Sequence, residues 1–118
     1  MKVIKTDNKK KDFYKLLGPV FGSRKVEKET HDRFYDDDGK IWYVIEGMGA
    51  ASVFDKRIKN FWAMNEEAAE QLLSSILKDA SGLSGVLPLA YEGAFRRAGF
   101  RTEKHSKNFM EVFKDEEN

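Results

Sequence analysis

The chain has 118 residues, of which 41% are hydrophobic and 35% charged, and its formal net charge is +1 at pH 7. This length suits a single domain, residues 1–118, and leaves no room for two. Nine Phe, four Tyr and two Trp beside only two Pro exclude disorder as the main state. No apolar run approaches the roughly 20 residues that span a bilayer. The first residues also lack the apolar segment of a signal peptide, so we expect no membrane partner and a cytoplasmic location.

The absence of cysteine excludes several kinds of functional site. Without it the chain has no disulfide, no thiolate metal ligand and no cysteine nucleophile. Its two histidines cannot form an ordinary zinc site without help from carboxylates, so we expect no metal.

Charge is unevenly distributed along the chain. Residues 1–59 contain 14 Lys or Arg against 10 Asp or Glu, whereas residues 60–118 contain 7 against 10. The basic segment 2–15 alone holds six lysines and could contact phosphates or an acidic protein. A solvated surface is the simpler interpretation, and no aromatic interleaving or recognition motif favours nucleic acid. The acidic tail 115–118 reads as a frayed end.

The first third of the chain predicts a strand, a helix and a charged connection. Alternating apolar and basic residues favour a short edge strand within residues 1–7. A helix is expected from Lys9 to Leu17, ended by Gly18-Pro19. Residues 22–40 are highly charged and predict a loop or a short helix. A polar connection this long is either a binding loop or a mobile link without function.

The middle of the chain predicts three successive strands. Residues 41–45, Ile-Trp-Tyr-Val-Ile, are the strongest strand signal, and turn residues 46–49 follow them. Residues 50–54 are expected to form the returning strand of a hairpin, and residues 58–64 a third strand. Small side chains at 49–52 indicate a close approach, more often by a helix than by a ligand.

A firm helix is predicted after Asn65. This residue is a good N-cap, and Glu66 and Glu67 occupy the first turn, where the helix dipole favours acids. Helical spacing predicts a buried stripe of Ala69, Leu72, Leu73, Ile76 and Leu77. Residues 81–85 are expected to end the helix.

The last part of the chain predicts a strand, a short helix and a hairpin. Residues 86–89 suit the strand and 91–98 the helix, and Gly99 lies where a helix end needs positive φ. Residues 100–105 and 109–114 are expected to pair as the hairpin. The complete order predicts an α/β (α+β) fold with a mixed, mostly antiparallel central sheet and helices on both faces.

This order of elements resembles the GNAT superfamily of acyl-CoA-dependent N-acetyltransferases. Residues 94–100, Ala-Phe-Arg-Arg-Ala-Gly-Phe, are similar to the family's short helix that ends in Gly-Phe before a final hairpin. Residues 44–54 resemble the family's central strand pair, and residues 58–77 its cofactor strand and main helix. The likeness covers almost the whole chain but rests mainly on the order of elements.

The resemblance implies acetyl-CoA as the cofactor. In this family the pyrophosphate binds backbone N–H groups at the start of the main helix, in a loop of pattern Arg/Gln-x-x-Gly-x-Gly/Ala. The corresponding residues here are 64–69, at the end of the cofactor strand. The implied cofactor contacts are Trp62, Ala63, Met64 and Ala69.

Two positions depart from that loop pattern. Met64 replaces the basic or amide residue and Glu67 replaces the first glycine, so that only Ala69 matches. With Glu66, two carboxylates could face an anion, at a cost on the order of 1 kcal/mol per contact in water. The cost falls if the carboxylates point away from the cleft.

The catalytic position also departs from the family. A Tyr four residues before the Gly of Gly-Phe commonly protonates the departing thiolate, but that residue here is Phe95. Tyr91 lies one helical turn earlier and could reach the same cleft, although a packed tyrosine is the commoner outcome. Glu46, Asp55 or a water could serve as the base for the amine, and the spacing does not select among them.

Two functions therefore remain open. The first is an N-acetyltransferase with a degenerate cofactor loop. The second is a non-catalytic binding or virion protein on the same scaffold, with segment 2–15 or residues 22–40 as its contact surface. Small GNAT-like proteins of bacteriophages, including internal virion proteins, are similar in this degeneracy, which would place the chain in the host cytoplasm or the virion.

Overall fold

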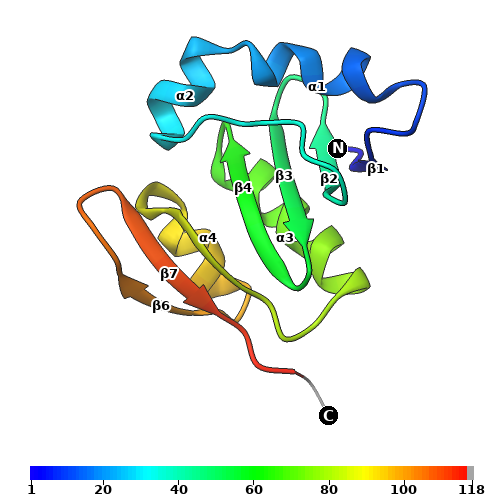
Figure 1. Ribbon diagram of the computed structural model, residues 1–118. Coiled ribbons are helices and arrows are strands. Elements are labelled where there is room, and N and C mark those ends of the chain that lie inside the picture. Colours follow the sequence, from blue (N-terminus) through cyan, green and yellow to red (C-terminus); the bar gives the residue numbers. More distant parts are fainter. Residues whose placement is uncertain (117–118) are drawn as a thin grey trace.

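In the computed structural model, which describes residues 1–116, seven strands form one sheet in the order β1-β2-β3-β4-β5-β7-β6 (Figure 1). All neighbouring strands are antiparallel except the parallel pair β4 and β5. The strands are β1 (Ile4–Thr6), β2 (Ile41–Ile45), β3 (Gly49–Phe54), β4 (Arg57–Ala63), β5 (Ser84–Pro88), β6 (Arg101–Lys104) and β7 (Phe109–Phe113).

Helices cover both faces of this sheet, which confirms the predicted fold class. One face carries α1 (Phe13–Phe21) and α2 (Arg24–Thr30), which pack on a core that includes Trp42. The other face carries α3 (Glu66–Asp79) and the short α4 (Glu92–Arg97), which follows a 3-10 turn η1 (Leu89–Tyr91). The core on that face is the larger one, and its fully buried members include Phe61, Leu72, Ile76, Phe95 and Met110.

The two parallel strands at the middle of the sheet pair over a very short length. Only Arg57 with Ser84 and Ile58 with Gly85 are partners, and no later residues of β4 and β5 pair. In contrast, β5 pairs with β7 along its whole length. The β5–β7–β6 part of the sheet therefore diverges from β4, and Figure 1 shows the β6–β7 hairpin lying apart from β4.

The predicted end of the first helix is wrong. The helix begins at Phe13 and continues through Gly18 and Pro19 to Phe21. A residue before proline usually avoids helical geometry because its Cβ meets the proline ring, but Gly18 has no Cβ. The extra turn buries Val20, which extends the apolar stripe of the helix.

The charged segment 22–40 contains both of the structures that its sequence allowed. The short helix α2 begins after Ser23, whose Oγ accepts a hydrogen bond from the Val26 N–H at 3.1 Å. Residues 31–40, which we call the strap, then cross the sheet as an irregular segment (Figure 1). Phe34 and Lys40 of the strap are buried, so this part is a packed covering rather than a free link.

Local capping predictions are confirmed. The Asn65 side chain accepts a hydrogen bond from the Ala68 N–H at 2.8 Å at the start of α3. Gly99 follows α4 with a φ of +95°. In the acidic tail, Asp115 and Glu116 form exposed ion pairs with Arg101 and Lys56. Residues 117–118 of the predicted tail lie outside the described part.

Among residues 1–116, no helix combines the length and the apolar character that a bilayer crossing requires.

Replacing Gly85 by Ala tests the geometry of the β4–β5 pair. A Cβ at Gly85 would lie 2.5 Å from the backbone oxygen of Ile58, so the strands would have to separate. We expect the Gly85→Ala protein to lose about 1–3 kcal/mol of unfolding free energy in urea titrations. Gly22→Ala is the control, because its Cβ would meet nothing closer than 3.7 Å. Equal stability of the two variants would contradict this account.

Candidate functional site

A small depression lies where β4 ends at α3 and β5 leads into η1 and α4. Its volume is about 160 Å³. It brings together four residues predicted from the sequence, namely Ala63, Met64, Ala69 and Tyr91. Ala90, Gly93 and Ala94 line the opposite wall, so the depression has little side-chain bulk on that side.

The hydroxyl of Tyr91 spans the gap that the diverging strands leave. It accepts a hydrogen bond from the Ala63 N–H at 3.1 Å and donates one to the Ala63 carbonyl at 3.2 Å. An unpaired N–H and C=O at the edge of a strand are costly when buried. Tyr91 therefore satisfies both backbone groups of Ala63 in place of a neighbouring strand.

The surroundings of Tyr91 keep its hydroxyl protonated. Burial raises the pKa of Tyr91 above its ordinary value, and the negative charge of Glu29 raises it further. The hydrogen bond from the Ala63 backbone acts in the opposite direction and lowers the pKa. The hydroxyl of Tyr91 is therefore neutral at physiological pH.

The start of α3 repels an anion less strongly than the sequence, with Glu66 and Glu67, predicts. The carboxylate of Glu66 lies 3.4 Å from the guanidinium of Arg97 on α4, and that guanidinium also contacts Glu70 at 2.7 Å. Arg97 therefore offsets part of the negative charge at this helix end. No local pattern predicts this role of Arg97, because its partners Glu70 and Glu66 precede it by 27 and 31 positions.

Trp62 and Glu46 belong to a second hollow on the other face of the sheet. This hollow, of about 320 Å³, lies between α1, α2 and the β2–β3 turn. Successive residues of a strand point to opposite faces, so Trp62 turns away from the depression that Ala63 lines. Glu46 is exposed beside Trp62 and is not part of the lining around Tyr91.

Glu29 connects the two faces electrostatically and was not predicted. Its carboxylate accepts a hydrogen bond from the Trp62 indole N–H at 2.8 Å. The same carboxylate is near enough to Tyr91 to raise the pKa of that hydroxyl. No local pattern marks Glu29, since the contact depends on α2 packing against β4.

Phe95, at the position where the GNAT resemblance would place a catalytic tyrosine, is a core residue. It is fully buried, and its ring lies 4.9 Å from that of Phe61 and 5.0 Å from that of Phe100. A hydroxyl at this position would be surrounded by aromatic rings. Tyr91 is therefore the hydroxyl donor that reaches the strand end.

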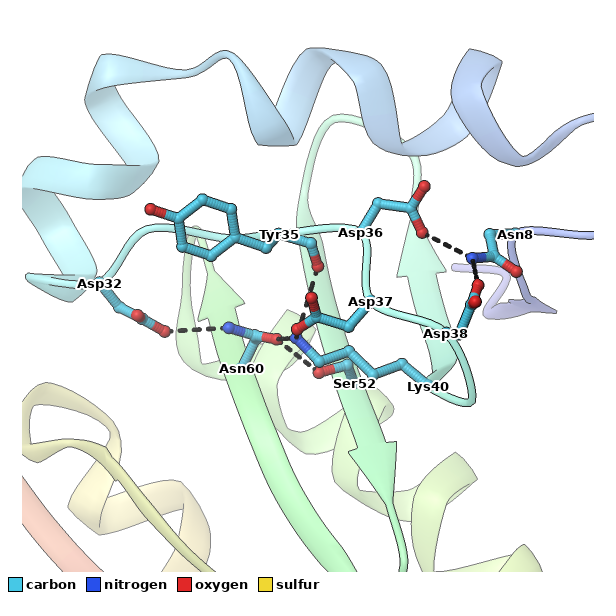
Figure 2. Close-up of polar contacts among 9 residues, drawn as sticks. All are labelled: Asn8, Asp32, Tyr35, Asp36, Asp37, Asp38, Lys40, Ser52 and Asn60. Carbon is cyan, nitrogen blue, oxygen red and sulfur yellow. Dashed lines mark hydrogen bonds and ion pairs between the residues drawn. The ribbon is translucent and has the colours of Figure 1, made fainter.

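A buried polar cluster holds the strap on the opposite face (Figure 2). Lys40 is only 7% exposed, and its ammonium donates to the Asn60 amide oxygen at 3.0 Å and contacts the Asp37 carboxylate at 3.0 Å. Ser52 donates to the same Asn60 oxygen at 2.6 Å, and Asn60 donates to Asp32 at 3.1 Å. One asparagine on β4 thus bonds to residues at both ends of the strap.

This cluster holds the strap in place, and it provides an acceptor for each N–H of the Lys40 ammonium. The three donor positions of an ammonium match the partners present, since Lys40 also donates to the Tyr35 carbonyl at 3.4 Å. Its charge lies 5.5 Å from the centre of the Trp42 ring. The Trp42 indole N–H has no hydrogen-bond partner within the described chain, and nothing in the structure explains this.

Across residues 1–116, no three His, Asp or Glu side chains are grouped so that they could hold a metal ion. Comparisons of the chain with family models, curated proteins and solved structures find no match. The interpretation of the site therefore rests on its geometry.

Replacing Asn60 by Leu tests the importance of the polar cluster. The change leaves the buried Lys40 ammonium and the Ser52 hydroxyl without their shared acceptor. We expect a loss of about 2–3 kcal/mol in urea unfolding, typical of a buried bond to a charged group. Lys40→Met in the same chain should recover part of the loss, because it removes the stranded charge.

The exposed variant Asp38→Asn is the matched control and should leave stability nearly unchanged. Additive losses for Asn60→Leu and Lys40→Met would contradict a direct coupling between the two side chains.

Proposed function

We propose that the chain is an acyl-CoA-dependent N-acyltransferase of GNAT type, in which Tyr91 is the proton donor. The observation that carries the proposal is the pair of hydrogen bonds between the Tyr91 hydroxyl and the N–H and C=O of Ala63. These bonds form where β4 and β5 diverge. When a thioester carbonyl displaces the Tyr91 hydroxyl from the Ala63 N–H, this N–H can bind the carbonyl oxygen, and the displaced hydroxyl lies beside it to protonate a leaving group.

The depression fits the acyl end of such a donor better than its pyrophosphate end. The Ala63 N–H, together with the small side chains of Ala90, Gly93 and Ala94, suits a thioester and the narrow chain that follows it. At the helix end, Asn65 already uses the Ala68 N–H, and Glu66 and Glu67 carry negative charge. We therefore expect acyl-CoA to bind weakly.

The residues divide the chemistry as follows. When bound, acyl-CoA supplies an electrophilic thioester carbonyl. The Ala63 N–H can donate a hydrogen bond to a carbonyl oxygen that gains negative charge. Tyr91 holds the proton that a departing thiolate needs. The proton that an attacking amine must lose would pass to water, because Glu29 is held by Trp62 on the other face of the sheet and does not line the depression.

Titration with acetyl-CoA tests the proposal directly. We expect calorimetric binding in the high micromolar to millimolar range. Replacing Glu66 and Glu67 together by Gln should tighten binding by about tenfold, because two like charges near the phosphates are removed. Turnover with a panel of primary amines can be followed by thiol release, since the chain contains no cysteine of its own. No heat and no thermal shift at millimolar acetyl-CoA would overturn the proposal.

Tyr91→Phe separates catalysis from binding. The variant should lose thiol release by about 10²- to 10⁴-fold, as expected for a missing general acid. Its affinity for acetyl-CoA should be unchanged or higher, because the Ala63 N–H no longer bonds to the tyrosine hydroxyl. Tyr14→Phe is the control, since that hydroxyl also bonds, to Asp36, but on an exposed surface far along the chain. A Tyr91→Phe protein with full turnover would rule out this role.

A non-catalytic binding protein is the second candidate. It is favoured by one observation, that Tyr91 already makes both of its hydrogen bonds within the chain and so closes the strand end. In that case Tyr91→Phe would lower stability, and acetyl-CoA would bind neither variant nor parent.

A further inference from the structure

The layer formed by α1 and α2 carries an excess of positive charge. Residues 9–35 contain eight Lys or Arg against four Asp or Glu, and residues 36–40 at the end of the strap add one Lys and three Asp. Seven of the cations in residues 9–35 are exposed and form no ion pair with a described residue. We call this set the basic face; it consists of Lys9, Lys10, Lys11, Lys15, Arg24, Lys28 and Arg33.

The acids of the same layer are mostly engaged with neighbouring neutral donors. Asp32 accepts from Asn60, and Figure 2 shows its carboxylate directed at that side chain rather than outward. Glu29 accepts from Trp62, and Asp12 from Thr6. Only Glu27 has no side-chain partner among the described residues of this layer. The cations therefore face solvent while most of the acids are held in place.

One end of the basic face forms a wide hollow beside α2. Arg24, Lys28, His31 and Arg33 line it together with the acids Glu27 and Asp32, and its volume is about 730 Å³. Lys25, which follows Arg24 at the start of α2, shares the lining of the hollow beside Trp62 with Lys15 of α1. The basic residues of the two helices thus adjoin one another along the layer.

Two exposed tyrosines accompany these cations, and the hydroxyl of one of them, Tyr14, donates a hydrogen bond to the Asp36 carboxylate of the strap. Tyr14 on α1 is 62% exposed and Tyr35 on the strap is 56% exposed. The Tyr35 ring points along the strap and away from the polar cluster (Figure 2). The other exposed large hydrophobic residues, Met1, Phe54 and Met64, lie outside α1, α2 and the strap. This composition suits stacking on bases better than insertion into lipid.

We propose that the basic face binds single-stranded nucleic acid. Its cations would contact successive phosphates, and the rings of Tyr14 and Tyr35 would stack on bases. The proposal does not depend on acyl transfer, because none of these residues lines the depression at Tyr91. A failure of one proposal therefore leaves the other intact.

The test uses the whole chain and a fluorescein-labelled single-stranded DNA of 20 nucleotides with mixed sequence. Fluorescence anisotropy at several salt concentrations should show binding that weakens steeply as salt rises. The triple variant Arg24→Gln, Lys28→Gln and Arg33→Gln should raise Kd at least about tenfold and reduce the salt slope by about two, at roughly 0.7 per phosphate contact.

A matched triple variant controls for net charge. Lys59→Gln, Lys104→Gln and Lys107→Gln remove the same charge from exposed positions on other elements, and Kd should change less than about twofold. Tyr35→Ala should raise Kd by about tenfold, whereas Tyr35→Phe, which keeps the ring, should not. Circular dichroism confirms that each variant is folded.

Three results would overturn the proposal. They are no binding of the oligonucleotide at low salt, equal weakening by the two triple variants, and binding to phosphatidylserine vesicles or polyglutamate without binding to the oligonucleotide.

Discussion

The short parallel contact between β4 and β5 decides how the rest of the site is built. The strands pair at only two positions, and Gly85 allows the approach at one of them because it has no Cβ. Beyond that point β5 follows β7, so the end of β4 pairs with β3 on one side and has no neighbouring strand on the other. Tyr91 then occupies the place of the missing strand at Ala63. The site thus exists because the sheet is divided.

The two faces of the sheet support different features of the molecule. On the α3 and α4 face, the ring of Tyr91 packs against Phe61, which in turn packs against Phe95, and Arg97 forms an ion pair with Glu66 at the start of α3. On the α1 and α2 face, the buried Lys40 and Asn60 hold the strap, and the cations remain outside. Glu29 is the residue that relates the faces, since it bonds to Trp62 and acts on Tyr91.

Local signals predicted most of the fold, and contacts between distant residues could not be predicted. The Asn65 cap, the strand at residues 41–45 and the turn at Gly99 each depend on a few adjacent residues. The predicted end of α1 was wrong because Pro19 normally stops a helix, whereas here Gly18 has no Cβ to meet the proline ring and the helix continues to Phe21. Tyr91 contacts Ala63, which lies 28 positions earlier, and Lys40 contacts Asn60, which lies 20 positions later. The periodicity of a sequence does not predict such distant pairs. Trp62 and Ala63 were assigned to one site although neighbouring strand residues face opposite sides.

The most direct test of the central claim is the amide resonance of Ala63 during a titration with acetyl-CoA. If Tyr91 holds the place of a bound carbonyl, the ¹⁵N–¹H signal of Ala63 should shift as acetyl-CoA is added, together with the ring signals of Tyr91. Gly47, in the hollow on the other face, should not shift. An unchanged Ala63 signal at millimolar acetyl-CoA would contradict the account.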